Sequence, residues 1–342
     1  MIHYKNIFLV AILFFTTLVL SGCDGPITID LGGKDKKDQG GIYASLDRGK
    51  HWKSMNSIPT TSGKPESVAD HDTRALAMDP NDHKAVYMGT EDNGLYYSYD
   101  VSRGWTWAEG LGRERIYDVV VSPDSKCIIY ASLKNELHKS TDCNRTWRPV
   151  YHDNKKSTHI NTIAVDHYDN ARVYIGTTRG EVIRSTDRGE SWKTLNRFES
   201  EVEEIEISSS DSRVLYVATK DDGIYKSNNK GEEWNSLEGN MEEFDNSTKY
   251  RDLLVSSAQE GLIFLGTDYG LLKSTDGGDS WERIELLTPE EETVINSIAV
   301  NPQDAQEIYY VTDTTFYRSL DGGENWAVQE LPTTRAGSRL LI

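Results

Sequence analysis

One eight-residue pattern recurs seven times along the chain and constrains its fold more than any other feature. The pattern has a serine first, an aspartate or asparagine third and a tryptophan last, as in "STDRGESW" from Ser185 to Trp192. The starting serines lie 53, 42, 45, 42, 47 and 45 residues apart, and the copy at Ser98 carries two extra residues. Periods of about 40–50 residues are typical of propeller blades. The octet therefore predicts a repeat protein.

The third residue of each octet suggests a site, but its repetition favours a structural role. An aspartate or asparagine there can accept backbone N–H bonds within its own turn, and the following glycine supplies a positive φ. The tryptophan can cover the turn and pack on the neighbouring sheet. A catalytic carboxylate would not recur around a rim. The seven structural residues are Asp47, Asp100, Asp142, Asp187, Asn229, Asp276 and Asp321.

The segments between octets predict four short strands per repeat. Short runs of apolar and small residues without helical periodicity are bounded by turn signals every 8–12 residues, as in "TRALAMDP", "KAVYMGT" and "GLYYSYD". Six units are complete, whereas the octet at Ser45 has only the last two strands of a blade. The C-terminal "GSRLLI", residues 337–342, matches the start of a first strand. We therefore expect an all-β, seven-bladed propeller of four-stranded antiparallel blades, closed by N- and C-terminal strands.

The N-terminal residues lie outside this repeat. One lysine, a 14-residue apolar run and "LSGC" predict a lipoprotein signal peptide over residues 1–22, with Cys23 lipidated. An ordinary secretory signal is the alternative. Residues 23–40 are rich in Gly, Asp and Lys and predict a flexible tether; their "ITIDL" is a candidate source of the missing second strand. The propeller is expected over residues 41–342, on a protein secreted and anchored to a bacterial cell envelope, at the periplasmic or outer surface.

Charge and composition restrict the partners. The chain has a formal net charge of −18, with 37 basic and 55 acidic residues. Such an acidic surface repels nucleic acid. The histidines have no zinc spacing, and the acidic turns follow no EF-hand pattern. We expect no metal and no cofactor.

Two cysteines are candidates for a disulfide bond. Cys127 begins a second strand, and Cys143 lies in the octet turn after the third strand. Antiparallel neighbours bring both positions to one end of the sheet, and a secreted protein meets oxidising conditions. Two unpaired thiols are the alternative.

The candidate binding residues lie on the first strands, facing the ring axis. Aligning these strands gives a polar column two positions before the apolar anchor, with Ser338 or Arg339 as a possible closing member. The six candidates are Arg74, Tyr117, Asn161, Glu203, Arg251 and Asn296. The next column holds Asp118, Glu204 and Asp252. Polar side chains there can simply line a water-filled channel, or they can form a ligand or partner site.

The octet resembles the Asp-box, or BNR, repeat of sialidases, sortilin-type receptors, xyloglucan-active glycoside hydrolases and the photosystem II stability/assembly factor family. The resemblance covers nearly the whole expected propeller and implies the fold, whereas the repeat is scaffold in all of these families. A single ring behind a lipoprotein signal is most similar to the assembly-factor-like group. This implies protein binding in assembly or maintenance of an envelope or membrane complex.

A carbohydrate-active propeller, either a glycoside hydrolase, a sialidase-like enzyme or a glycan-binding module, is the alternative. Channel carboxylates could form the pair that a glycosidase needs. The Arg-Ile-Pro signature typical of sialidases is missing, and the xyloglucan-active enzymes use two propellers. Binding is therefore favoured over catalysis. The expected partners are a protein, the lipid bilayer through acylated Cys23 and, under the alternative, a glycan.

Overall fold

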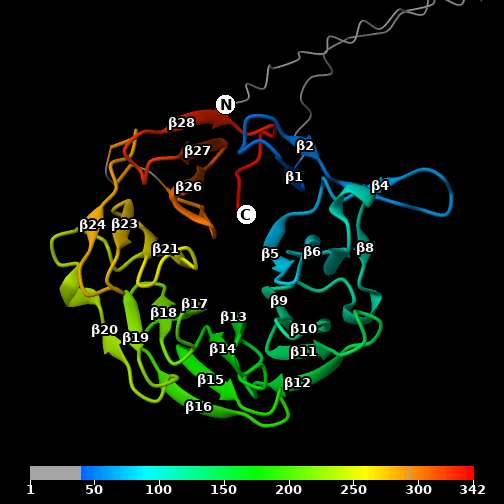
Figure 1. The fold of residues 1–342 in the computed structure, drawn as a ribbon. Helices are drawn as coiled ribbons and strands as arrows, with labels where there is room; N and C mark the ends of the chain where they lie inside the picture. The colour runs from blue at the N-terminus through cyan, green and yellow to red at the C-terminus, as the bar shows by residue number, and fades with distance from the viewer. Residues whose placement is uncertain (1–39, 290, 293) are drawn as a thin grey trace, which may run out of the picture. The chain divides into compact units, whose positions relative to one another are not determined.

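The computed structural model describes residues 40–289, 291–292 and 294–342, and its regular structure is strands with three 3-10 turns. Six four-stranded antiparallel sheets follow one another in the chain. In each sheet the first strand lies innermost in the ring and the fourth lies at the outer edge (Figure 1). These sheets are the blades of a β-propeller.

The strand bounds repeat closely from blade to blade. The first blade has β5 (Thr73–Asp79), β6 (Asp82–Thr90), β7 (Leu95–Ser98) and β8 (Thr106–Trp107). The second has β9 (Asp118–Ser122), β10 (Ser125–Leu133), β11 (Glu136–Ser140) and β12 (Arg148–His152). The third has β13 (Ile160–Val165), β14 (Val173–Thr177), β15 (Glu181–Ser185) and β16 (Lys193–Arg197).

The other three blades follow the same order. The fourth has β17 (Val202–Ile207), β18 (Leu215–Thr219), β19 (Ile224–Ser227) and β20 (Asn235–Ser236). The fifth has β21 (Tyr250–Val255), β22 (Ile263–Thr267), β23 (Leu271–Ser274) and β24 (Glu282–Arg283). The sixth has β25 (Ser297–Asn301), β26 (Asp304–Thr312), β27 (Thr315–Ser319) and β28 (Ala327–Glu330). The 3-10 turns are η1 (Val101–Arg103), η2 (Glu109–Leu111) and η3 (Glu238–Asn240).

The expectation of seven four-stranded blades is wrong, because the structure has six. The octet at Ser45 joins only β1 (Tyr43–Ala44) to β2 (Lys53–Ser54), a two-stranded sheet between the sixth and first blades (Figure 1). A second small sheet pairs β3 (Ser57–Ile58) with β4 (Glu66–Ser67). The segment "ITIDL" lies outside the described residues.

The C-terminal residues approach the ring axis without forming the predicted strand. Residues 337–342 have no ladder partner, and one backbone bond, from Gly337 N to the Asp313 carbonyl, and several side-chain bonds hold them instead. Leu340 N donates to Ser297 Oγ at 3.2 Å, and the Ser338 hydroxyl donates to the Thr73 carbonyl at 3.3 Å. The sequence pattern therefore predicted where this segment lies, but not how it is held.

The hydrophobic core lies between neighbouring blades. Tyr174 of the third blade and Val202 and Leu215 of the fourth are each fully buried in one such cluster. The blades approach closely enough to require glycine at position 176, where an added Cβ would lie 2.4 Å from Val202 Cγ1. Each blade therefore buries its faces on its neighbours, as expected where β-branched and aromatic residues alternate along strands.

The octet at Ser185 closes the turn between β15 and β16. Gly189 N donates to Ser185 Oγ at 2.8 Å, and Ser191 N donates to Asp187 Oδ1 at 2.8 Å. Arg188 and Gly189 have φ of 61° and 93°, so two successive residues are left-handed. The indole N–H of Trp192 donates to the carbonyl of Val150 in the preceding blade at 2.8 Å. The turn thus binds itself and its neighbour.

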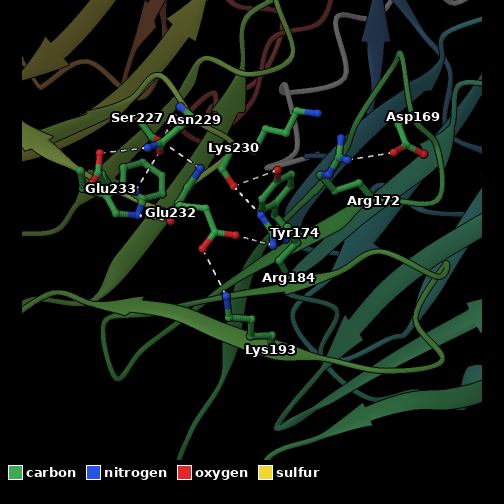
Figure 2. Close-up of polar contacts among 12 residues, drawn as sticks. Asp169, Arg172, Tyr174, Arg184, Lys193, Ser227, Asn229, Lys230, Glu232 and Glu233 are labelled. Atoms are coloured by element: carbon green, nitrogen blue, oxygen red, sulfur yellow. Dashed lines mark hydrogen bonds and ion pairs between the residues drawn. The ribbon is translucent and has the colours of Figure 1, made fainter.

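The octet also supplies a backbone acceptor to the preceding blade. In Figure 2 the Lys230 carbonyl of the fourth blade accepts from Tyr174 and Arg184 of the third, at 3.3 and 2.9 Å. The Arg188 carbonyl does the same for Tyr130 and Lys139, at 3.2 and 2.8 Å. These bonds give the octet a structural role between blades.

A disulfide bond joins Cys127 to Cys143 across the end of the second blade. It closes a loop between residues 16 apart in sequence. Cys143 and Asn144 take the two left-handed positions, with φ of 59° and 67°, where other octets have glycine in the second.

Removing this disulfide is expected to destabilise the protein. Closing a loop of this length restricts the unfolded chain by about 3 kcal/mol. The double variant Cys127→Ser/Cys143→Ser should therefore melt about 5 °C lower. Thermal unfolding measures this, and the mass of the unfolded wild type should rise by two hydrogens on reduction. An unchanged melting temperature or an unchanged mass would contradict the stabilising bond.

Candidate functional site

A polar cavity of about 680 Å³ opens at the ring axis, and all six candidate binding residues line it. Its walls come from the starts of the first strands and from the turns between second and third strands. The octets close the opposite ends of the sheets, so the cavity lies on the other face. The members predicted from the sequence are Arg74, Tyr117, Asn161, Glu203, Arg251 and Asn296.

Arg74 and Tyr117 are parts of one stacked group. Arg74 Nη1 lies 3.2 Å from Glu91, and Arg115 Nε lies 2.5 Å from the same carboxylate. The Arg74 guanidinium lies 4.9 Å from the centre of the Tyr117 ring, and His159 stacks on that ring at 4.7 Å. Tyr117 is 9% exposed, so it orients Arg74 more than it offers a free aromatic face.

Asn161 and Asn296 occupy equivalent positions in two blades and join each blade to the chain beside it. Asn161 Nδ2 donates to the Val202 carbonyl at 3.1 Å, and Asn296 Nδ2 donates to the Gly337 carbonyl at 3.0 Å. Their amide groups therefore shape the cavity wall through inter-blade bonds.

Arg251 and Glu203 supply the remaining charges predicted from the sequence. Arg251 Nε donates to Asp268 at 2.6 Å, and its side chain is 40% exposed. Glu203 is half-buried, and its pKa is raised by burial and by the charge of Glu201. The cavity can thus offer both an arginine and a carboxyl group to a ligand.

Sequence reasoning missed the cavity residues that follow the second strands. Glu91, Lys220 and Asp268 each come directly after the threonine that ends a second strand, and Lys249 precedes β21. The motif "MGTE", "VATK" and "LGTD" is the signal that could have found the first three. The alignment of first strands alone could not show these positions.

The second column of carboxylates forms hydrogen bonds between neighbouring blades. Asp118 accepts from Ile163 N at 2.7 Å, Glu204 from Leu253 N at 3.2 Å, and Asp252 from Ile298 N at 2.6 Å. Each donor belongs to the first strand of the next blade. These carboxylates therefore have a structural function, which the sequence analysis did not foresee.

The same position is polar in two further blades. Thr162 Oγ1 accepts from Ile205 N at 3.2 Å, and Ser297 Oγ from Leu340 N at 3.2 Å. The first blade has Ala75 there, which offers no side-chain acceptor. Val119 N, the equivalent donor of the second blade, therefore donates to Asp118 of its own strand at 2.8 Å. This hydrogen bond from a side chain to the backbone of the next segment therefore occurs in five blades and is missing from the first.

The charge of Arg339 acts on all three of these carboxyl groups, Asp118, Glu204 and Asp252, and lowers their pKa values, against the effect of burial. Burial raises the pKa of Asp118 to about 7, and burial together with the charge of Glu204 raises the pKa of Asp252 to about 7. The pKa of Glu206 is raised well above its ordinary value by burial and by the neighbouring carboxylates. Arg339 Nη1 lies 3.9 Å from Asp252 and offsets part of this negative charge.

The carboxyl groups of the first strands and those of the octets predict opposite dependences of stability on pH. A folded pKa of about 7 for Asp252, against an ordinary value of about 4, stabilises the fold below pH 4 and loses that contribution as pH rises through 7. The pKa values of Asp187 and Asp276 are lowered to about 2 by hydrogen bonds within their octets. Their contribution is present above pH 4 and is lost as pH falls towards 2.

Substituting Asp252→Asn should isolate the contribution to stability that is lost as pH rises, because asparagine keeps an acceptor for Ile298 N. Between pH 5 and 8 the wild type should lose on the order of 2 kcal/mol of unfolding free energy relative to the variant. His71 and His159 are half-buried, and partial burial lowers their pKa values, so they act in the opposite sense and equally in both proteins. Urea unfolding across this range gives the comparison, and parallel pH profiles would refute it.

Within the described residues, no group of three or more His, Cys, Asp or Glu side chains is arranged to hold a metal ion. No helix in the same part of the chain is long and apolar enough to cross a membrane.

Comparisons with known proteins place the chain among propellers. The family model described as "Sortilin, neurotensin receptor 3" matches residues 135–265, less than half of the chain. A search of curated proteins gives no match. The solved structures include YCF48 from Cyanidioschyzon merolae, with a TM-score of 0.60 and 13% identity over 82% of this chain and 89% of that one.

Two other solved structures are similar. YCF48 bound to D1 peptide has a TM-score of 0.58 and 15% identity, covering 76% of this chain and 82% of that one. The GH74 xyloglucanase from Xanthomonas campestris has a TM-score of 0.60 and 17% identity, covering 75% of this chain. The present chain spans only 45% of that enzyme. At these identities the likeness shows the shared fold.

Proposed function

We propose that this protein binds a polypeptide segment in the cavity on the ring axis, as a scaffold for assembly or maintenance of an envelope or membrane complex. The observation that supports this proposal most is that all six candidate residues line one open cavity of about 680 Å³. Ligand sites in propellers are expected at such an opening, since the octet face is occupied by turns that bind one another.

The chemistry of the lining suits a peptide. Its charged side chains include both signs and several are paired, such as Arg74 with Glu91 and Arg251 with Asp268. These pairs are exposed enough to exchange partners with side chains and backbone groups of a ligand. The similar structure of YCF48 holds a D1 peptide, which supports a polypeptide as the class of partner.

The proposal includes the Asp-box scaffold, its resemblance to the photosystem II assembly-factor group and an envelope location. The signal-like residues 1–22 and the lipidated Cys23 lie outside the described residues. Two acyl chains would anchor the protein stably to a bilayer. Metabolic labelling with a fatty acid, compared between the wild type and Cys23→Ser, tests this part by itself.

A carbohydrate-active propeller is the second candidate, favoured by carboxyl groups whose pKa values stand near neutrality. Asp118 and Asp252 are raised to about 7, a range suited to a general acid. The argument against it is that each already accepts a backbone N–H from the neighbouring blade.

Affinity capture with substituted proteins separates the two candidates. The wild type and the variants Arg74→Ala, Tyr117→Ala and Arg251→Ala are immobilised and loaded with detergent-solubilised membranes of the native cells. We expect a polypeptide retained by the wild type and lost from Arg74→Ala and Arg251→Ala. Turnover of an aryl glycoside or xyloglucan oligosaccharide by the wild type, with equal retention by all four proteins, would overturn the proposal.

A further inference from the structure

A second hollow, which shares no lining residue with the axial cavity, lies on the fifth blade. This fifth-blade groove has a volume of about 240 Å³ and is lined by the turn after β22, the start of β23 and the chain from Arg283 to Pro289. Leu271 and Ile284 line it and are buried, at 0% and 6% exposure. Ile284 N donates to the Leu271 carbonyl at 2.9 Å, so the pairing of the two outer strands continues under the groove.

The connection from the fifth blade to the sixth leaves apolar side chains exposed. In three other blades, the connection to the next blade buries an apolar side chain. Leu111, Phe198 and Met241 are 6%, 7% and 0% exposed. In the fifth blade, Leu287 lines the groove and is 59% exposed, and Val294 is 46% exposed. Large apolar side chains left exposed beside a groove indicate an interaction surface.

The groove follows the axial cavity directly along the chain. Asp268 lines the cavity and pairs with Arg251, and the next residue, Tyr269, lines the groove. Both residues belong to the turn between β22 and β23, on the face that the octets do not occupy. Consecutive Cα atoms are about 3.8 Å apart. A polypeptide that leaves the cavity across this turn therefore reaches the groove within a few residues.

The size and chemistry of the groove suit one apolar side chain. An apolar cavity of about 150 Å³ holds benzene, so about 240 Å³ is enough for a leucine, methionine or phenylalanine side chain. The ion pair of Arg283 with Glu285 belongs to the same lining and can meet backbone groups of a ligand. An apolar base with a few polar groups at its edge is the usual composition of a binding pocket.

We propose that the fifth-blade groove is a second subsite for the polypeptide bound in the axial cavity, and that it takes a large apolar side chain of that polypeptide. The inference rests on the proposed function, because it assigns a second contact to the same ligand. The ligand then combines a polar or charged stretch, held in the cavity, with an apolar residue nearby. An extended chain advances about 3.3 Å per residue, so a segment of roughly ten residues reaches across both sites.

Photo-crosslinking at two positions of the full-length protein, in its own cells, tests the subsite. A photoreactive amino acid replaces Leu287 in the groove or Lys249 in the cavity lining, and mass spectrometry maps each adduct on the captured polypeptide. The label at position 249 is also combined with Leu287→Glu, Leu287→Met or Leu320→Glu. Leu320 is the matched control, because it is a leucine 48% exposed in an octet. All three variants should melt close to the wild type, since both leucines are exposed.

We expect both positions to label the same polypeptide, at residues within about ten of each other. Leu287→Glu should lower the adduct yield from position 249 about tenfold, because it removes an apolar contact and buries a charge. Leu287→Met and Leu320→Glu should leave this yield unchanged.

Two results would overturn the subsite and leave the proposed function intact. One is an adduct from position 249 that Leu287→Glu does not weaken, and the other is no adduct, or a different polypeptide, from position 287. Absence of an adduct from position 249 would overturn the proposed function and the subsite with it.

Discussion

Deleting residues 336–342 should destabilise the ring and abolish ligand binding. The deletion removes one wall of the cavity, Ala336 to Arg339, and the bond from Gly337 N to the Asp313 carbonyl at 2.6 Å. It also removes Leu340, which packs with Trp52 and Phe316 between the sixth blade and β1–β2. Burial of one leucine and a few hydrogen bonds add up to about 3–5 kcal/mol, so the melting temperature should fall by about 5–8 °C.

A shorter deletion provides the matched control. Leu341 and Ile342 are 39% and 45% exposed, so removing these two residues alone should change the melting temperature little. If the longer deletion fails to fold, Leu340→Ala gives a milder test of the same packing. Equal stability of the wild type, the longer deletion and Leu340→Ala would show that the tail does not close the ring.

Reversing the charge of Arg251 should weaken partner binding about 100-fold, since a like charge at an interface costs several kcal/mol. A glutamate at this position would face Asp268, the present ion-pair partner at 2.6 Å, and would remove a donor from the cavity. Arg145→Glu is the control, because Arg145 is exposed in an octet on the other face. The amount of partner retained from solubilised native membranes measures the effect.

Thermal unfolding of the two variants separates a local effect from misfolding. Both Arg251 and Arg145 are exposed, so both variants should melt close to the wild type. Equal retention of the partner by Arg251→Glu and Arg145→Glu would remove Arg251 from the binding surface.

The repeated part of the fold was predictable from the sequence because each blade carries its own local signals. The short apolar run in "KAVYMGT" and the turn "EDNG" mark β6 and the turn after it, and the octet marks the next connection. Closure of the ring was not predictable in the same way. The tail is held by contacts such as Leu340 N with Ser297 Oγ, between residues 43 apart in sequence, which no local pattern encodes.

The candidate site was predictable in position and less so in detail. The repeat register placed Arg74 and Arg251 at equivalent positions, and the ring then brought them to one cavity. Side-chain roles depend on neighbours from other blades. Tyr117 is covered by His159, and Asp252 holds Ile298 N of the next blade. One blade read alone could not show either contact.

Photo-crosslinking in native membranes tests the binding site most directly. A photoreactive amino acid replaces Lys249 in the cavity lining or Thr186 on the octet face, in the full-length protein expressed in its own cells. A specific polypeptide adduct should form from position 249, should weaken when Arg251→Glu is added, and should be absent from position 186. An adduct from position 186 alone, or one from position 249 that is unaffected by Arg251→Glu, would contradict polypeptide binding in the cavity.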